Sequence, residues 1–74
     1  MNNFRDIAVL YCFGKRLVYL RKLKNISQKD LAYIMEVEIS QVYRIEKGKI
    51  NPTLTTIILI SAALKIELKD LFDY

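Results

Sequence analysis

The chain has 74 residues, a net charge of +4 and no histidine, and 53% of its residues are hydrophobic. A chain of this length forms one small domain (1–74) with no room for a cleft between domains, and its apolar content excludes a disordered protein. With one cysteine and no histidine, it can form neither an internal disulfide nor a Cys/His zinc site. The positive charge suits a nucleic acid or an anionic surface but does not by itself select one.

The first predicted helix covers residues 4–24. Apolar side chains recur there in steps of three or four, the spacing of one helix face: Phe4, Ile7, Leu10, Phe13, Leu17 and Leu20. Gly14 lies inside this stripe and marks either a close helix crossing or a break. Cys12 lies in the apolar run IAVLYCF, so we expect a buried or half-buried thiol in a reducing setting. This run and the later LTTIILISAAL are too short to span a bilayer.

Two short helices with a tight turn between them are predicted next. Ser27 is a suitable N-cap for the first, and Asp30 three residues later gives a weak form of the capping box. Its buried face consists of three apolar side chains: Leu31, Ala32 and Met35. The turn follows at residues 36–37, and the other short helix runs over about 39–47. Gly48 can take the left-handed conformation that ends it.

A fourth helix is predicted over about 54–65, after a loop at Pro52 and an N-cap at Thr53. The segment TLTTIILI is rich in β-branched residues and resembles a strand locally. It has no second strand to pair with. Helical spacing toward a core is kept by Leu54 and Ile57 inside the segment and by Ser61 and Leu64 after it. A last short helix over about 68–73 completes an all-α fold.

The helix over 39–47 presents a polar face that matches a groove of DNA. Val42 and Ile45 are its buried side, while the opposite side carries donors, an aromatic ring and two cations: Ser40, Tyr43, Arg44 and Lys47. Together with the helix before it, this forms a helix-turn-helix, in which the second helix enters the major groove. Ser40 and Gln41 can donate or accept hydrogen bonds there, and Arg44 can pair with guanine. Periodicity alone leaves open that this is merely a solvated helix face.

From about Phe13 to Phe72 the chain resembles the Cro/C1-type helix-turn-helix family, also called the XRE or lambda-repressor-like family. The matching segments are FGKRLVYLRKLKNISQKDLA, VYRIEKGKINPTL and ISAALKIELKDLF, in the order and spacing of the family. The resemblance implies a five-helix DNA-binding domain whose second and third helices form the helix-turn-helix, usually acting as a dimer. Residues 1–12 lie outside the resemblance or lengthen the first helix.

The resemblance also implies roles for individual residues. Base edges would be read by side chains at the start and middle of the third helix: Ile39, Ser40 and Arg44, with Gln41 beside them. Backbone phosphates would contact a second set: Gln28, Tyr43, Lys47, Lys49 and Asn51. Because the family often pairs residues at these places, we expect an ion pair between Arg21 and Glu46 that is at least partly buried.

Three residues depart from the family pattern. Glu36 stands in the turn, where glycine is common, and Glu38 stands at the N-cap of the third helix, where serine or threonine is common. Glu38 either caps the helix or reaches a cytosine amine, and phosphates repel it in both cases. Ile39 is the third departure, because it stands where polar base-reading residues are frequent in the family. It either packs on a thymine methyl group or closes the edge of the core.

Surplus apolar residues near the C-terminus predict self-association. Six side chains would form the interface: Ile58, Leu59, Ala62, Ile66, Phe72 and Tyr74. A two-fold dimer through them would set two recognition helices about 34 Å apart, as a palindromic operator requires. The alternative is a monomer in which the N-terminal segment with Phe4, Ile7, Leu10 and Tyr11 covers this surface.

We therefore expect a cytoplasmic transcription regulator that binds double-stranded DNA, as a dimeric repressor of its own or a neighbouring operon. Roles as a restriction-modification controller or an antitoxin fall within this expectation. The alternative is a protein-interaction module on the same fold with weak DNA binding, and a salt-dependent DNA-binding curve would separate the two. No enzyme activity, cofactor, small-molecule ligand or membrane association is expected, because no nucleophile–base pair, paired carboxylates or phosphate loop is visible.

Overall fold

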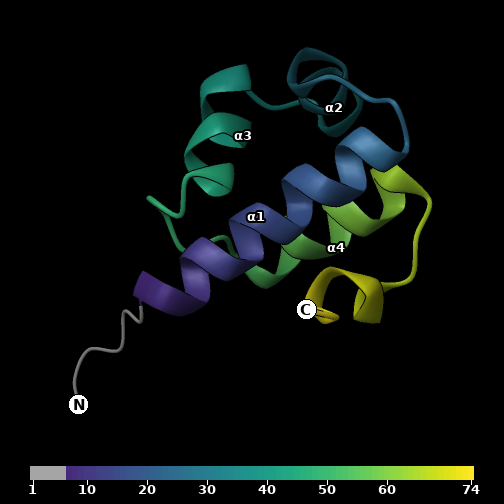
Figure 1. The fold of residues 1–74 in the computed structure, drawn as a ribbon. Coiled ribbons are helices and arrows are strands. Elements are labelled where there is room, and N and C mark those ends of the chain that lie inside the picture. Colours follow the sequence, from purple (N-terminus) through teal and green to yellow (C-terminus); the bar gives the residue numbers. More distant parts are fainter. Residues whose placement is uncertain (1–6) are drawn as a thin grey trace.

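The computed structural model describes residues 7–74 as four α-helices followed by one 3-10 helix (Figure 1). The elements are α1 (Ile7–Leu23), α2 (Gln28–Met35), α3 (Ile39–Glu46), α4 (Leu54–Leu64) and the 3-10 helix η1 (Leu68–Phe72). Residues 7–74 contain no strand, so the all-α prediction is confirmed, although the predicted fifth helix is a short 3-10 segment. No helix in this range combines the length and apolarity that crossing a bilayer requires.

Local side-chain chemistry sets the helix starts as the sequence predicted. The Ser27 hydroxyl accepts the backbone N–H of Asp30 at 3.0 Å and so caps α2. The Thr53 hydroxyl accepts the backbone N–H of Thr56 at 3.2 Å and caps α4. The β-branched segment that α4 contains is therefore helical, because a cap begins it and packing against the core outweighs its local preference.

One hydrophobic core joins all five elements. Its buried members are Phe13, Leu17, Leu20, Leu31, Ala32, Met35, Val42, Ile45, Ile60, Leu64 and Leu71. Helix α1 packs against α3 and η1, while α2 packs against α3 and α4, and α4 also contacts η1. Figure 1 shows the result: α3 lies on one side of α1, and η1 lies on the other side.

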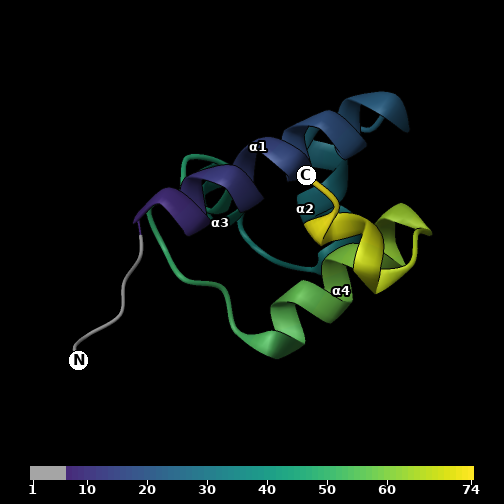
Figure 2. The ribbon, with the colours of Figure 1, turned by 60° about the horizontal axis from the view of Figure 1, so that its bottom comes forward.

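The structure corrects the predicted faces of α1 and α4 in several places. Ile7 is 74% exposed and Leu54 is 69% exposed, because the first turn of each helix projects beyond the other elements (Figure 2). Ile60, which was not predicted to face the core, is fully buried in α4. Cys12 is exposed rather than buried, since it precedes the buried Phe13 and successive helical residues point about 100° apart. Phe4, the first residue of the predicted stripe, lies outside the described residues.

Two glycines allow the backbones of α1 and α3 to touch. A Cβ atom built on Gly14 would lie 2.3 Å from the carbonyl oxygen of Glu46, so the glycine marks a close helix crossing and not a break. Gly48 follows α3 with φ +71°, and a Cβ atom there would lie 3.0 Å from the Cα atom of Tyr11. The N-terminal half of α1 is therefore held against the C-terminal end of α3 at two points.

Candidate nucleic-acid interface

The turn between α2 and α3 is tight because Glu36 adopts the left-handed conformation, with φ 60°. The Glu36 N–H donates to the Tyr33 carbonyl at 3.1 Å, and the Val37 N–H donates to the Ala32 carbonyl at 3.0 Å. These two bonds close the end of α2 in the manner usually provided by glycine. The departure from the family pattern at position 36 therefore leaves the turn intact, at a conformational cost of about 1–2 kcal/mol.

The outer face of α3 carries the residues predicted to read bases. Ser40 and Arg44 are exposed and Gln41 is half-buried. Ile39 is 48% exposed and lies outside the core, so it does not close the core edge. Glu38 precedes the helix without making a capping hydrogen bond through its side chain. The start of α3 thus presents a short polar and apolar surface to solvent, with one carboxylate at its edge.

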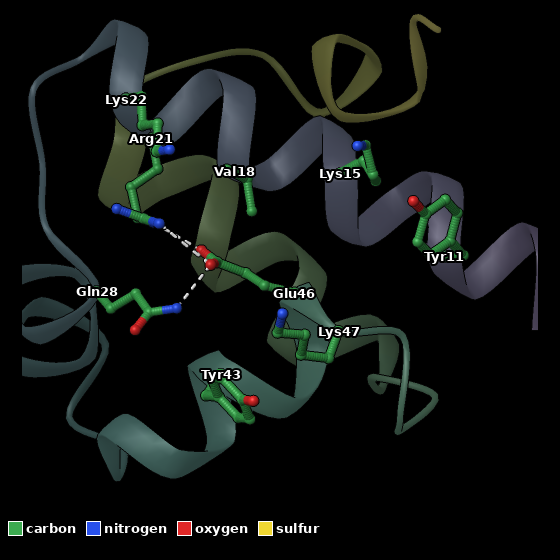
Figure 3. A pocket seen from close by; sticks show the side chains of 9 residues that line it. All are labelled: Tyr11, Lys15, Val18, Arg21, Lys22, Gln28, Tyr43, Glu46 and Lys47. Atoms are coloured by element: carbon green, nitrogen blue, oxygen red, sulfur yellow. Dashed lines mark hydrogen bonds and ion pairs between the residues drawn. The ribbon is translucent and has the colours of Figure 1, made fainter.

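The predicted ion pair between Arg21 and Glu46 is present and buried. Arg21 Nε lies 2.6 Å from Glu46 Oε2, and Arg21 Nη2 donates to Oε1 at 3.1 Å (Figure 3). The two side chains are 10% and 4% exposed. Arg21 Nη1 also donates to the Ile26 carbonyl at 3.0 Å. This bidentate pair fixes α1 to α3 and orients the C-terminal end of α3.

Gln28, predicted to contact phosphate, lies in the same network. Its Nε2 donates to Glu46 Oε1 at 2.8 Å, which joins the first turn of α2 to α3 (Figure 3). An amide nitrogen carries two N–H groups, so one remains for a second acceptor. While this bond is formed, the second N–H group and the carbonyl oxygen of Gln28 can contact a ligand.

The other predicted phosphate residues lie around the C-terminal end of α3. Tyr43, Lys47, Lys49 and Asn51 are all exposed. The Lys47 ammonium lies 5.6 Å from the centroid of the Tyr43 ring, a cation–π contact along the helix. Both side chains stand at the edge of a groove between α1 and α3.

This α1–α3 groove has a volume of about 480 Å³ (Figure 3). Its walls come from three helices: Tyr11, Lys15, Val18, Arg21, Lys22, Gln28, Tyr43, Glu46 and Lys47. Four of these residues were not predicted from the sequence to line a site: Tyr11, Lys15, Val18 and Lys22. A repeated spacing was the available signal, because Tyr11 and Lys15 are four residues apart, as are Tyr43 and Lys47.

The apolar surface predicted for self-association is exposed on α4 and at the C-terminus. Ile58 is 49% exposed and Leu59 is 42% exposed, and Ala62, Phe72 and Tyr74 are exposed as well. Ile66 differs, because it is half-buried and packs against the core. The Phe72 ring also contacts Phe13, with 5.4 Å between ring centroids.

The N-terminal turns of α1 do not cover this surface. Ile7 is 74% exposed, and Tyr11 is 53% exposed with its backbone against Gly48 on the α3 side. Within residues 7–74, Ile58 and Leu59 on α4 therefore stay exposed, although Tyr74 lines a pocket together with Tyr11 of α1. The contribution predicted for Phe4 lies outside the described residues.

A helix-turn-helix family model matches residues 17–71. The chain belongs to this helix-turn-helix family. It is 36% identical over 59 residues to an uncharacterised HTH-type transcriptional regulator of Methanocaldococcus jannaschii, covering 80% of this chain and 89% of that protein. It is also 36% identical over 63 residues to the control protein C.BamHI of Bacillus amyloliquefaciens, covering 84% of this chain and 78% of that protein.

A solved structure of similar fold agrees with this assignment. The restriction-modification controller protein C.AhdI of Aeromonas hydrophila superposes with a TM-score of 0.85 and 40% sequence identity. The match covers 88% of this chain and 98% of C.AhdI. The Cro/C1-type resemblance of the sequence is thereby confirmed, and its helix-turn-helix corresponds to α2 and α3.

Proposed function

We propose that this chain is a transcription regulator that binds double-stranded DNA in a sequence-specific manner through α3. The observation that carries the proposal is the exposed face of α3 with Ser40 and Arg44, held on a helix-turn-helix by the buried Arg21–Glu46 pair. An α-helix of this kind fits the major groove, where each base pair presents a different pattern of donors and acceptors. Membership of the family and its regulator relatives support the same function.

Four residues on α3 would contact bases in this proposal. Arg44 would pair bidentately with a guanine, and Ser40 and Gln41 would bond to neighbouring base edges. Ile39, half-exposed at the helix start, suits contact with a thymine methyl group. Phosphate contacts would come from Tyr43 and Lys47 at the end of α3, and from Gln28, Lys49 and Asn51. These contacts position the duplex without reading its sequence.

Selection of duplexes from a random pool, followed by binding measurements on Arg44→Ala, tests the proposal. Losing a bidentate arginine should cost about 1–3 kcal/mol at the preferred site and relax one base position. Lys69→Ala is the control, because Lys69 is an exposed cation on η1, on the far side of α1 from α3 (Figure 1). Unchanged affinity and base preference in Arg44→Ala would place the recognition surface elsewhere. Failure to select any duplex would favour a protein-interaction module instead.

The proposed active form is a homodimer that binds a palindromic operator. The exposed apolar side chains of α4, together with Phe72 and Tyr74, support a two-fold contact with a second copy. In such a dimer the two α3 helices would lie about 34 Å apart, in successive major grooves on one side of the duplex.

Among possible biological roles, we propose that of a restriction-modification controller acting in the cytoplasm, as a repressor of its own or a neighbouring operon. The similarity to C.BamHI and to nearly the whole of C.AhdI supports this role. Binding to duplexes taken from upstream of its own gene, and the identity of the flanking genes, test it. Flanking genes without a restriction enzyme or methyltransferase would contradict it.

A further inference from the structure

Two Tyr–Lys pairs line the α1–α3 groove, one pair on each wall (Figure 3). On α1, the Lys15 ammonium lies 5.6 Å from the centroid of the Tyr11 ring. On the opposite wall, Lys47 and Tyr43 have the same arrangement at the same distance. Tyr11 and Lys15 precede residues 17–71, the part of the chain that the helix-turn-helix family model matches.

The charges in the groove are unbalanced in favour of an anion. Four cationic side chains and one carboxylate line it. That carboxylate, Glu46, already accepts bonds from Arg21 and Gln28, and within residues 7–74 the Arg21–Glu46 contact is the only ion pair. Lys15 and Lys47 therefore have no carboxylate partner in the described part of the chain. With the two tyrosine hydroxyls, they form donors suited to a ligand with several negatively charged oxygens.

The two walls are held at a fixed separation. Gly14 lets α1 lie directly against the Glu46 carbonyl, and Gly48 lets the end of α3 lie against the Tyr11 backbone. Farther along α1, the Arg21–Glu46 pair ties the two helices together again. The groove is therefore formed before any ligand arrives, which lowers the entropic cost of binding.

We propose that the α1–α3 groove binds a backbone phosphate of the same duplex that α3 reads, with Tyr11 and Lys15 of α1 as ligands opposite Tyr43 and Lys47. The inference rests on the proposed function. Tyr43 precedes Arg44 on α3, and Lys47 is the C-cap of the same helix. A phosphate between the walls therefore belongs to the strand that borders the major groove entered by α3. Helix α1 thereby positions the duplex, outside the helix-turn-helix itself.

Salt dependence of DNA binding tests this inference. Each phosphate contact contributes about 0.9 to the slope of log affinity against log salt concentration, so its loss changes the affinity ratio between 50 and 200 mM salt about threefold per chain. Lys15→Gln should show this change, weaken binding to all sequences alike and leave base preference intact. Lys69→Gln removes the same charge on the far side of α1 and should change neither the salt slope nor the affinity. Lys15 is exposed, so an unchanged thermal midpoint should accompany the weaker binding.

A second measurement locates the ligand. The ring resonances of Tyr11 should shift when a short duplex is added, and Tyr11→Phe should weaken duplex binding in the same sequence-independent way as Lys15→Gln. If inorganic phosphate alone shifts these resonances and Lys15→Gln binds duplex normally, the groove is a site for free anions and the inference is wrong. If Arg44→Ala still changes base preference while Lys15→Gln behaves as Lys69→Gln, the groove inference fails and the proposed function stands. A chain that selects no duplex would overturn both.

Discussion

Substitution of Gly14 by alanine tests how closely α1 and α3 cross. The added Cβ atom would lie 2.3 Å from the Glu46 carbonyl oxygen and 2.8 Å from the Ile45 carbonyl oxygen. Ordinary van der Waals contact begins at 3.4 Å, so the two backbones would have to separate by about 1.1 Å. Both neighbours are backbone atoms of α3, which cannot rotate away as the end of a flexible side chain can.

Two opposing effects set the magnitude. Alanine is a better helix former than glycine by about 1 kcal/mol in a helix interior. Overpacking costs about 1–3 kcal/mol, and a clash with backbone belongs at the upper end of this range. The net loss should be about 2 kcal/mol, which lowers the melting temperature of so small a domain by about 8–16 °C. Separation of the helices should also loosen the contact between Arg21 and Glu46.

Thermal and denaturant unfolding followed by circular dichroism measure this loss. The neighbouring variant Lys15→Ala is the control, because Lys15 is exposed and its replacement should change stability by no more than about 0.5 kcal/mol. A Gly14→Ala protein as stable as its parent, or more so, would refute the close crossing. The helix-propensity gain would then be the only effect left.

Three further substitutions address the turn, the ion pair and self-association. Glu36→Gly should raise the free energy of unfolding by about 1 kcal/mol, because the backbone at position 36 is left-handed. Glu36→Gln keeps a side chain there and should not raise it. Equal stability of the two variants would argue against backbone strain at this position. Glu46→Gln should lower the free energy of unfolding by about 3–5 kcal/mol, because Arg21 would stay buried without its charged partner. The double variant Arg21→Met, Glu46→Leu should lower it less. A Glu46→Gln protein with the melting temperature of its parent would contradict this. Leu59→Lys should reduce the light-scattering mass from two chains to one and weaken binding to a palindrome without unfolding the chain. A mass of one chain for the parent at micromolar concentration would count against the dimer.

The features that sequence determined are local ones. Ser27 and Thr53 cap helices by bonding to backbone groups three residues away, so neighbours in sequence suffice to predict them. The left-handed glycine after α3 and the spacing of Val42 and Ile45 are likewise set within one or two helical turns. The family resemblance added the Arg21–Glu46 pair, which no local pattern predicts.

Tertiary structure decided what depends on how the helices meet. Helix α4 is apolar on nearly every side, so its sequence has no polar face to show which residues turn inward. Packing against the other helices buries Ile60 and leaves Leu54 exposed. The two Tyr–Lys pairs lie about 30 residues apart along the chain, and each reads as an ordinary exposed pair on its own helix. They form one groove only because Gly14 and Gly48 bring two helix backbones into contact, and the distance between helices is a property of packing that no periodicity along a single helix contains.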